Sequence, residues 1–226
     1  RDVEFRFNTL AEAPDILAEA PDVVIIATGG LPNTHILEAG NDLVVSTWDI
    51  ISGDVKPGAN VLLYDDAGDH SALQAAETIA NTGAHVEVMT PDRTFAPDVM
   101  AMNLVPYMRN LQDKDVRFTV TWRLMAAEKE GNQLKAVIGT DYSKHREERH
   151  FDQIVVNHGT LPLDDLYFEL KPQSLNKGEM DQTSLIEGKP QPWAGDGFEL
   201  YRIGDAVAGR NTHAAIYEAL RLMKEV

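Results

Sequence analysis

The chain has 226 residues, of which 43% are hydrophobic, so it is long enough to bury one sizeable core or two small ones. Its formal net charge of −16 argues against nucleic acid or an anionic membrane surface as a partner. The lack of cysteine excludes disulfides, thiol catalysis and cysteine-ligated zinc or iron–sulfur clusters within this segment, and the lack of a bilayer-length apolar run or a signal peptide favours the cytoplasm.

The opening part of the chain predicts the later half of an α/β unit. Residues 3–8 alternate apolar and polar side chains like a strand, and residues 10–20 have helical tendency interrupted by Pro14. Residues 23–27 form an apolar run that is typical of a parallel-sheet strand covered on both faces. Because the chain enters this pattern without a leader or a cap, we expect it to be a piece of a longer protein.

From Lys56 the sequence starts a second α/β unit. A buried strand is predicted over residues 61–64 and an amphipathic helix over residues 71–81, which Gly83 ends. Residues 85–90 form the next strand. This strand–helix–strand unit has the size of a parallel βαβ crossover.

A helix and a meander are predicted next. The helix covers residues 96–111 and is expected to break near Pro106. The meander is predicted to have strands over residues 116–128, 134–141 and 148–156. A turn at Gly131-Asn132 joins the first two of them. The polar run over residues 143–150 is interpreted as a solvated hairpin tip.

The sequence contains an internal echo. The string "VVIIATGGLPN" at residues 23–33 resembles "QIVVNHGTLPLDD" at residues 153–165, with an apolar strand, a glycine and then Leu-Pro in each. Duplicated nucleotide-binding units that end alike leave this pattern, although strand–Gly–Pro exits are common in themselves.

The loop after the strand at residues 61–64 has the position of a phosphate-binding loop but lacks its glycines. It reads Asp65-Asp66-Ala67-Gly68-Asp69-His70-Ser71-Ala72, in which Ala67, Asp69 and Ala72 occupy the three glycine positions. Each carboxylate placed near a diphosphate costs on the order of 1 kcal/mol even in well-screened water. A weakened or lost pyridine-nucleotide site is therefore favoured, and the acids can equally serve as helix caps, with Asp69 or Ser71 bonding free N–H groups.

A second glycine-terminated strand lies near the end of the chain, in "YRIGDAVAGRN" at residues 201–211. An aspartate after a strand-terminal glycine can accept a hydrogen bond from a ribityl hydroxyl, and the helix predicted over residues 213–224 can direct its N-terminus at a pyrophosphate. The alternative is a plain strand–turn–helix in which Asp205 is only a cap. The candidate cofactor-binding residues are Ala27, Thr28, Gly29, Gly30, Gly204, Asp205, Asn211, His213, Ala214 and, more weakly, Gly68.

No catalytic acid, base or nucleophile is predicted, and no metal site. The histidines lack metal-ligand spacing, and His70 with Asp66 and Asp69 is more simply an exposed loop than a metal site. Residues 171–194 are interpreted as a long loop that covers the nucleotide region or a partner surface.

Four strings together resemble a known family. They are "DVVIIATGG", "YDDAGDHSALQAAE", "VVNHGTLPLDDLYFELKP" and "YRIGDAVAGRNTHAAIYEALRL". They look like the C-terminal region of the flavoproteins that include trimethylamine dehydrogenase, histamine dehydrogenase and 2,4-dienoyl-CoA reductase, and they resemble most the bacterial demethylases of N-methylproline and dimethylglycine. The resemblance covers nearly the whole chain. It implies a separate N-terminal part, an old-yellow-enzyme-like barrel with FMN and a 4Fe-4S cluster, followed by the first FAD-binding βαβ unit.

The resemblance implies an α/β, Rossmann-like two-dinucleotide-binding fold. Residues 1–50 and 165–226 would be the remainder of the FAD domain, and residues 51–164 an inserted NAD(P)-binding-like domain with a β-meander. In the reductase the equivalent region helps to bind FAD and NADPH, whereas in trimethylamine dehydrogenase it holds only ADP and electrons leave through a partner flavoprotein. The altered glycines of the loop put NAD(P)H binding in doubt and favour the dehydrogenase type, with FAD or ADP bound here.

The expected function is therefore the dinucleotide-binding region of a flavin-dependent dehydrogenase or demethylase of a small N-methylated amine. Two alternatives stay open: an NAD(P)H-dependent flavin reductase whose loop tolerates a pyrophosphate, and a non-catalytic module that docks an electron-transfer partner. The expected partners are the N-terminal barrel of the same protein, an electron-transfer flavoprotein and further copies of the chain in a homo-oligomer. Alone, the segment is expected to be inactive.

Overall fold

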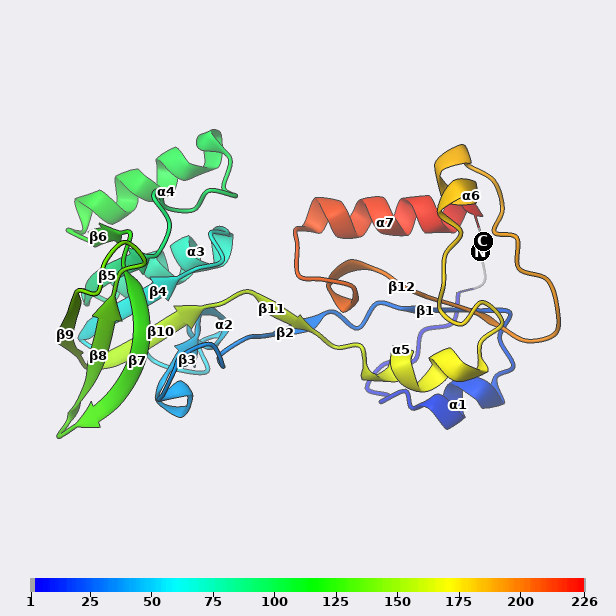
Figure 1. Cartoon of the computed structure of the whole chain (residues 1–226), viewed down its shortest axis with the longest axis horizontal. Coiled ribbons are helices and arrows are strands. Elements are labelled where there is room, and N and C mark those ends of the chain that lie inside the picture. Colours follow the sequence, from blue (N-terminus) through cyan, green and yellow to red (C-terminus); the bar gives the residue numbers. More distant parts are fainter. Residues whose placement is uncertain (1–2, 226) are drawn as a thin grey trace. The chain divides into compact units, whose positions relative to one another are not determined.

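The computed structural model describes residues 3–225, and it divides the chain into two compact mixed α/β units (Figure 1). Unit 1 contains the chain up to Leu31 and from Thr160 onward, and unit 2 contains Pro32–Gly159. Residues 32–50, predicted to lie in the first domain, belong to unit 2 because strand β3 (Val45–Ser46) pairs in parallel with a strand of that unit. None of the helices within residues 3–225 is long and apolar enough to span a bilayer.

Unit 2 is built on a parallel sheet of five strands in the order β3-β10-β4-β5-β6. Its other strands are β4 (Asn60–Asp65), β5 (His85–Thr90), β6 (Arg117–Val120) and β10 (Gln153–Asn157). Its helical elements are η1 (Asn41–Leu43), α2 (Thr47–Ser52), α3 (His70–Ala80) and α4 (Ala101–Asp113). The predicted parallel strand–helix–strand unit is confirmed as β4-α3-β5.

The two faces of strand β4 explain why its sequence is continuously apolar. Val61 and Leu63 pack into a cluster formed largely with helix α3, whereas Leu62 and Tyr64 pack into a second cluster with the strands of the meander. Alternate residues of a strand point to opposite faces, so a sheet covered on both sides needs apolar side chains at every position.

The meander is an antiparallel sheet of three strands, β7 (Arg123–Glu130), β8 (Gln133–Gly139) and β9 (Arg146–Phe151). Two predicted strands were each wrong in extent. The run over residues 116–128 divides into β6 and β7 at Thr121, whose φ is +63°, and the run over residues 148–156 divides into β9 and β10 at Asp152. At both breaks the chain passes between the parallel sheet and the meander. Part of the predicted hairpin tip, from Arg146 on, lies in β9.

Helix α4 also differs from its prediction. It begins at Ala101 rather than at Ala96, which has a φ of +45° and so cannot be helical. It continues through Pro106 without ending there. The ring of Pro106 is exposed, as is Met102, whose carbonyl would be its i−4 acceptor, so water can hydrate the freed group.

Unit 1 contains a two-stranded parallel sheet of β1 (Val23–Ile26) and β12 (Glu199–Arg202). Its helical elements are α1 (Ala13–Ala18), α5 (Asp165–Leu170), η2 (Lys171–Gln173), α6 (Gln182–Glu187), η3 (Gly204–Ala206) and α7 (Thr212–Glu225). Burial along β1 alternates: Val24 and Ile26 lie in the core beside Leu170 and Leu200, whereas the other two residues are half-buried, so one face of the predicted two-sided strand is covered more fully than the other.

The start of the chain gives two further corrections. Residues 3–8 form no strand: Phe5 and Phe7 stack on each other and are 71% and 77% exposed, and no described segment pairs with them. Pro14 does not interrupt a helix but stands in the first turn of α1, where its missing N–H would be unpaired in any case.

The internal echo has a structural counterpart in the two segments that join the units. Strand β2 (Gly30–Pro32) follows Gly29, strand β11 (Thr160–Pro162) follows Gly159, and both glycines have a φ of +75°. The two strands pair with each other (Figure 1), flanked by hydrogen bonds from the Asn33 amide to Gly159 O (2.9 Å) and from the Leu163 amide to Gly29 O (3.0 Å).

Candidate functional site

The carboxyl ends of β1 and β12 form one candidate edge, in unit 1. Ile26 lies opposite Arg202, and the Ile203 amide donates to the Ile26 carbonyl at 3.0 Å. Residues 27–30 and the Gly204-Asp205 turn, which are far apart in the sequence, therefore emerge at the same edge of the two-stranded sheet. Ligands of open α/β sheets bind outside the carboxyl ends of the strands, which makes this edge a candidate site.

Two neighbouring glycines at the end of β1 differ in what surrounds them. Gly29 has a φ of +75° and open space where a Cβ would stand. A Cβ at Gly30 would lie 2.3 Å from Thr160 Cγ2 and 2.6 Å from Leu161 O, so this glycine allows β11 to pass. Thr28 is similarly engaged, since its hydroxyl donates to the Leu163 carbonyl. Of this group, Ala27 and Gly29 have the more open surroundings.

The turn after β12 is held by carboxylates on both sides. Gly204 has a φ of +62°, and its amide donates to Glu218 Oε2 of helix α7 at 2.8 Å. Asp205 Oδ1 accepts from the Arg210 amide at 3.3 Å, a bond within the loop that precedes helix α7. That bond uses one of its several acceptor positions and leaves the others for a ligand.

Helix α7 begins at this edge with its own cap. Asn211 Oδ1 accepts from the Ala214 amide at 2.9 Å, so its side chain closes the first turn. His213 is exposed and Ala214 is half-buried. The small Ala215 lets the helix approach the turn, because a Cβ at Gly204 would lie 3.4 Å from the Ala215 Cβ.

The second candidate edge is in unit 2, where the loop with the lost glycines follows β4. Asp65 Oδ1 accepts hydrogen bonds from the amides of Ala67 (3.2 Å) and Gly68 (3.0 Å). Asp69 caps helix α3, as the sequence suggested, by accepting from the Ser71 amide at 2.8 Å. Amide donors of this loop are thus already bonded to its own carboxylates.

Asn157, at the end of β10, fixes both carboxylates. Its Nδ2 donates to Asp65 Oδ1 and to Asp69 Oδ1, each at 2.9 Å, and its Oδ1 lies 3.5 Å from the Thr47 hydroxyl. Asp65 is only 1% exposed, and this burial is the largest cause that raises its pKa from 3.8 to about 6. The bonds from Gly68 and Asn157 act in the opposite direction and favour the charged form.

The next residue after β10 carries a further pair. His158 Nδ1 hydrogen-bonds Asp66 Oδ1 at 2.9 Å, and the histidine side chain is completely buried. Its ring meets the Tyr64 ring edge-on at 5.5 Å between centroids. The loop after β4 is therefore tied to the end of β10 through both of its first two aspartates.

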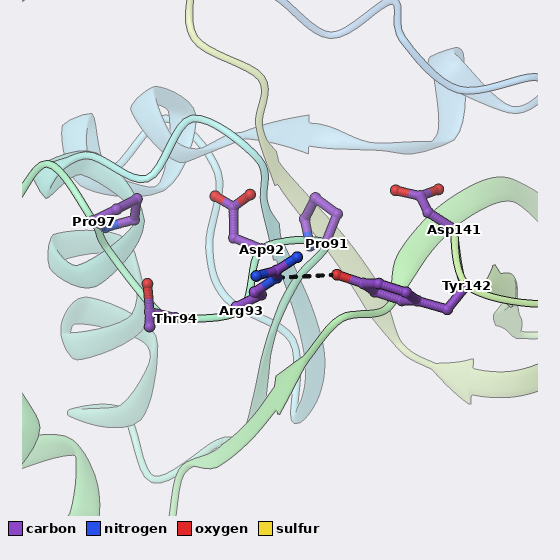
Figure 2. Close-up of a pocket in the computed structure, with 7 residues that line it drawn as sticks. All are labelled: Pro91, Asp92, Arg93, Thr94, Pro97, Asp141 and Tyr142. Atoms are coloured by element: carbon purple, nitrogen blue, oxygen red, sulfur yellow. Dashed lines mark hydrogen bonds between the residues drawn. The ribbon is translucent and has the colours of Figure 1, made fainter.

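A hollow of about 480 Å³ opens beside this loop, at the end of β5 (Figure 2). It is lined by Pro91, Asp92, Arg93, Thr94, Pro97, Asp141 and Tyr142. Arg93 Nε donates to the Tyr142 hydroxyl at 3.4 Å across it, drawn as the dashed line in Figure 2. The same Pro97 packs where a Cβ at Gly68 would stand, at 2.7 Å, so the hollow borders the loop directly.

Several of these residues were missed by sequence reasoning. Asn157 and His158 stand at the end of an apolar run, and polar residues directly after a parallel strand are a signal that could have found them. Glu218, Arg93 and Tyr142 have no such signal, because their importance comes from the turn or hollow they face. Within residues 3–225, histidine and acidic side chains form no group of three or more suited to a metal ion.

No family model matches the chain, but individual proteins do. The probable N-methylproline demethylase of Rhizobium meliloti (strain 1021) is 66% identical over 99% of this chain and 34% of its own length. The N,N-dimethylglycine/sarcosine dehydrogenase of Chromohalobacter salexigens is 42% identical over the same shares. The chain thus spans about a third of the length of these curated relatives.

The fold is also found among solved structures. A 2-naphthoyl-CoA reductase in complex with 2-naphthoyl-CoA has a TM-score of 0.73 and 26% identity, over 97% of this chain and 29% of that one. The likeness again covers one part of a longer chain.

Proposed function

This chain belongs to the family of the N-methylproline demethylase and the N,N-dimethylglycine/sarcosine dehydrogenase, and we propose that it is the dinucleotide-binding region of a flavin-dependent oxidoreductase in that family. The observation that carries the proposal is the 66% identity that extends over 99% of the chain. The proposed reaction of the whole protein is the oxidation of a small N-methylated amine. A flavin supplies the two-electron acceptor in such a reaction.

The proposed place for FAD, or for its ADP moiety, is the β1/β12 edge of unit 1. Gly29 offers open space for close approach, and Asp205 keeps acceptor positions for a ribityl or ribose hydroxyl. Helix α7 adds the positive end of its dipole. These residues would bind and orient the cofactor, and none of them is proposed to take part in the chemistry.

The other groups that the family resemblance implies would be held elsewhere in the protein. This chain has no cysteine to bind a 4Fe-4S cluster, so the cluster and the FMN are proposed to belong to the N-terminal barrel. Electrons would leave to an electron-transfer flavoprotein, and the full-length protein would form a homo-oligomer. Within the two-dinucleotide arrangement we propose, unit 2 corresponds to the NAD(P)-binding-like domain.

In unit 2 the proposal is a weakened pyridine-nucleotide site. A phosphate loop binds through unpaired backbone N–H groups, and here the amides of Ala67, Gly68 and Ser71 already have acceptors. One observation favours the alternative, an NAD(P)H-dependent reductase. The hollow at the end of β5 contains Arg93, and an arginine at this position can accommodate a ribose phosphate.

Calorimetric titration of the purified chain with FAD, ADP, NADH and NADPH tests the proposal. Saturable binding of FAD or ADP with no binding of either pyridine nucleotide is expected. Tight NADPH binding that an Arg93→Ala variant loses would replace the proposal with the reductase. If none of the four ligands binds, the FAD or ADP site proposed at the β1/β12 edge is overturned for this chain.

A further inference from the structure

The loop after β4 keeps the backbone form of an anion-binding turn. Gly68 has a φ of +72°, and the successive amides of Ala67 and Gly68 converge on one oxygen, Asp65 Oδ1. Converging backbone N–H groups at the start of a helix form the concave sites that bind phosphates in other proteins. Here the oxygen they bind belongs to the chain itself.

The internal carboxylate is held firmly in this position. Asp65 is 1% exposed and also accepts from Asn157 Nδ2. Gly68 is held from the other side, where its carbonyl accepts from the Asp98 amide at 3.1 Å and the Pro97 ring fills the space beside it. Because the carboxylate is buried and its neighbours are fixed, it has little space into which it could turn to release the amides.

A diphosphate would have to displace this carboxylate or lie against it. Displacement would break hydrogen bonds to a charged acceptor, which are stronger than those to a neutral one. Coexistence would bring like charges together in a largely buried place, where screening is weak. Asp69, which shares Asn157 with Asp65, adds a second carboxylate at the same edge.

We propose that Asp65 is a built-in anion that fills the phosphate position of unit 2 and determines that this unit rejects diphosphate-containing ligands. This inference rests on the proposed function, from which it takes the view of unit 2 as a weakened nucleotide site. It assigns the rejection to one side chain rather than to the loss of glycines at Ala67, Asp69 and Ala72.

The test measures anion binding at the loop in the full chain by NMR, from the backbone amide shifts of Ala67 and Gly68. Inorganic pyrophosphate and, separately, NADPH are added to the unsubstituted chain, to Asp65→Gly, to the nearly isosteric Asp65→Asn, and to Asp42→Asn. Asp42 is an exposed aspartate of the same unit and serves as the matched control. Asp65→Asn keeps the shape of the side chain, so it provides a result even if Asp65→Gly does not fold.

The unsubstituted chain and the control are expected to show no saturable shift at either amide. Asp65→Gly is expected to bind pyrophosphate at least about tenfold more tightly, because two amides regain a charged acceptor, and Asp65→Asn to show a smaller gain from the loss of charge. If the folded Asp65 variants bind no better than the unsubstituted chain, the inference is overturned while the weakened site stands. If the unsubstituted chain itself binds NADPH with shifts at these amides, both are overturned.

Discussion

The two sheet edges of this molecule have the same type of location but differ in how much open space they keep. At the carboxyl ends of β1 and β12 the Gly204 amide is bonded to Glu218, but Gly29 faces open space and Asp205 keeps free acceptor positions. At the carboxyl ends of β4 and β10, the loop amides are already bonded to Asp65 and Asp69, and Asn157 holds both carboxylates. The comparison teaches that a position in the fold marks where a ligand could bind, whereas unpaired donors and open space decide whether it can.

The largest expected effect is on the carboxylate pair of unit 2. Asn157→Ala removes the donor that Asp65 and Asp69 share and leaves two partly unsatisfied acids facing each other. We expect a loss of about 3–4 kcal/mol in the free energy of unfolding, measured by urea denaturation. Asn103→Ala, an exposed change in α4, is the control and should cost little. A loss no larger than that of the control would show that Asp65 and Asp69 do not depend on the hydrogen bonds from Asn157.

The second prediction concerns the pH dependence of stability that Asp65 gives to unit 2. The pKa of Asp65 is raised from 3.8 to about 6 by burial, so the folded state binds more protons than the unfolded state between these values. The contribution of this group to stability therefore falls as pH rises from about 4 to 6, by roughly 3 kcal/mol in all, and is constant above that.

Urea midpoints measured from pH 4 to 8 on the unsubstituted chain and on Asp65→Asn test this sign. The difference between the two should shrink toward acidic pH, since the protonated carboxyl is neutral like the amide. Asp42→Asn, an exposed change in the same unit, is measured alongside as the control. A difference that grows toward acidic pH would show that hydrogen bonds to the charged form outweigh its burial.

Two glycines with nearly equal backbone angles provide a third, smaller test. Gly68 has a φ of +72°, and a Cβ added to it would lie 2.7 Å from a Pro97 ring atom, whereas Gly29 has a φ of +75° and nothing within 4 Å of that position. Gly29→Ala should cost about 1 kcal/mol for its backbone conformation alone. Gly68→Ala should cost about 2–3 kcal/mol because the clash is added. Equal losses in urea denaturation would remove the distinction between an open and a filled edge.

The smallest expected effect concerns the ligand of unit 1. Asp205→Ala should weaken FAD about tenfold, the value of one hydrogen bond to a charged group, and should leave ADP unchanged if the aspartate accepts from the ribityl chain. Calorimetric titration with both ligands measures the two affinities. An equal loss for ADP would place the bond on the ribose instead, and no loss for either would leave Asp205 with only its bond to the Arg210 amide.

Local patterns in the sequence predicted the individual elements well where burial was simple. The strand at residues 85–90 was predicted with its observed bounds, and α3 and β4 to within a residue at either end. The strand over residues 3–8 was wrong because alternation describes a strand only if a partner covers its apolar side. The runs over residues 116–128 and 148–156 were wrong because apolar periodicity continues across a change of sheet, and nothing local marks the change except Thr121 and Asp152.

The candidate site divides in the same way. Three features can be read from the sequence, because each depends on neighbours along the chain. They are the loss of glycines between β4 and α3, the cap at Asp69 and the similarity of the two Leu-Pro segments. That Asp65 fills the loop could not be read, because its position depends on Asn157, which is 92 residues away and is brought beside it only by the pairing of β10 with β4. Sequence by itself determined which side chains stand at the strand ends. The order of strands in the sheet decided which of them meet, because hydrogen bonds depend on distances that only tertiary packing sets.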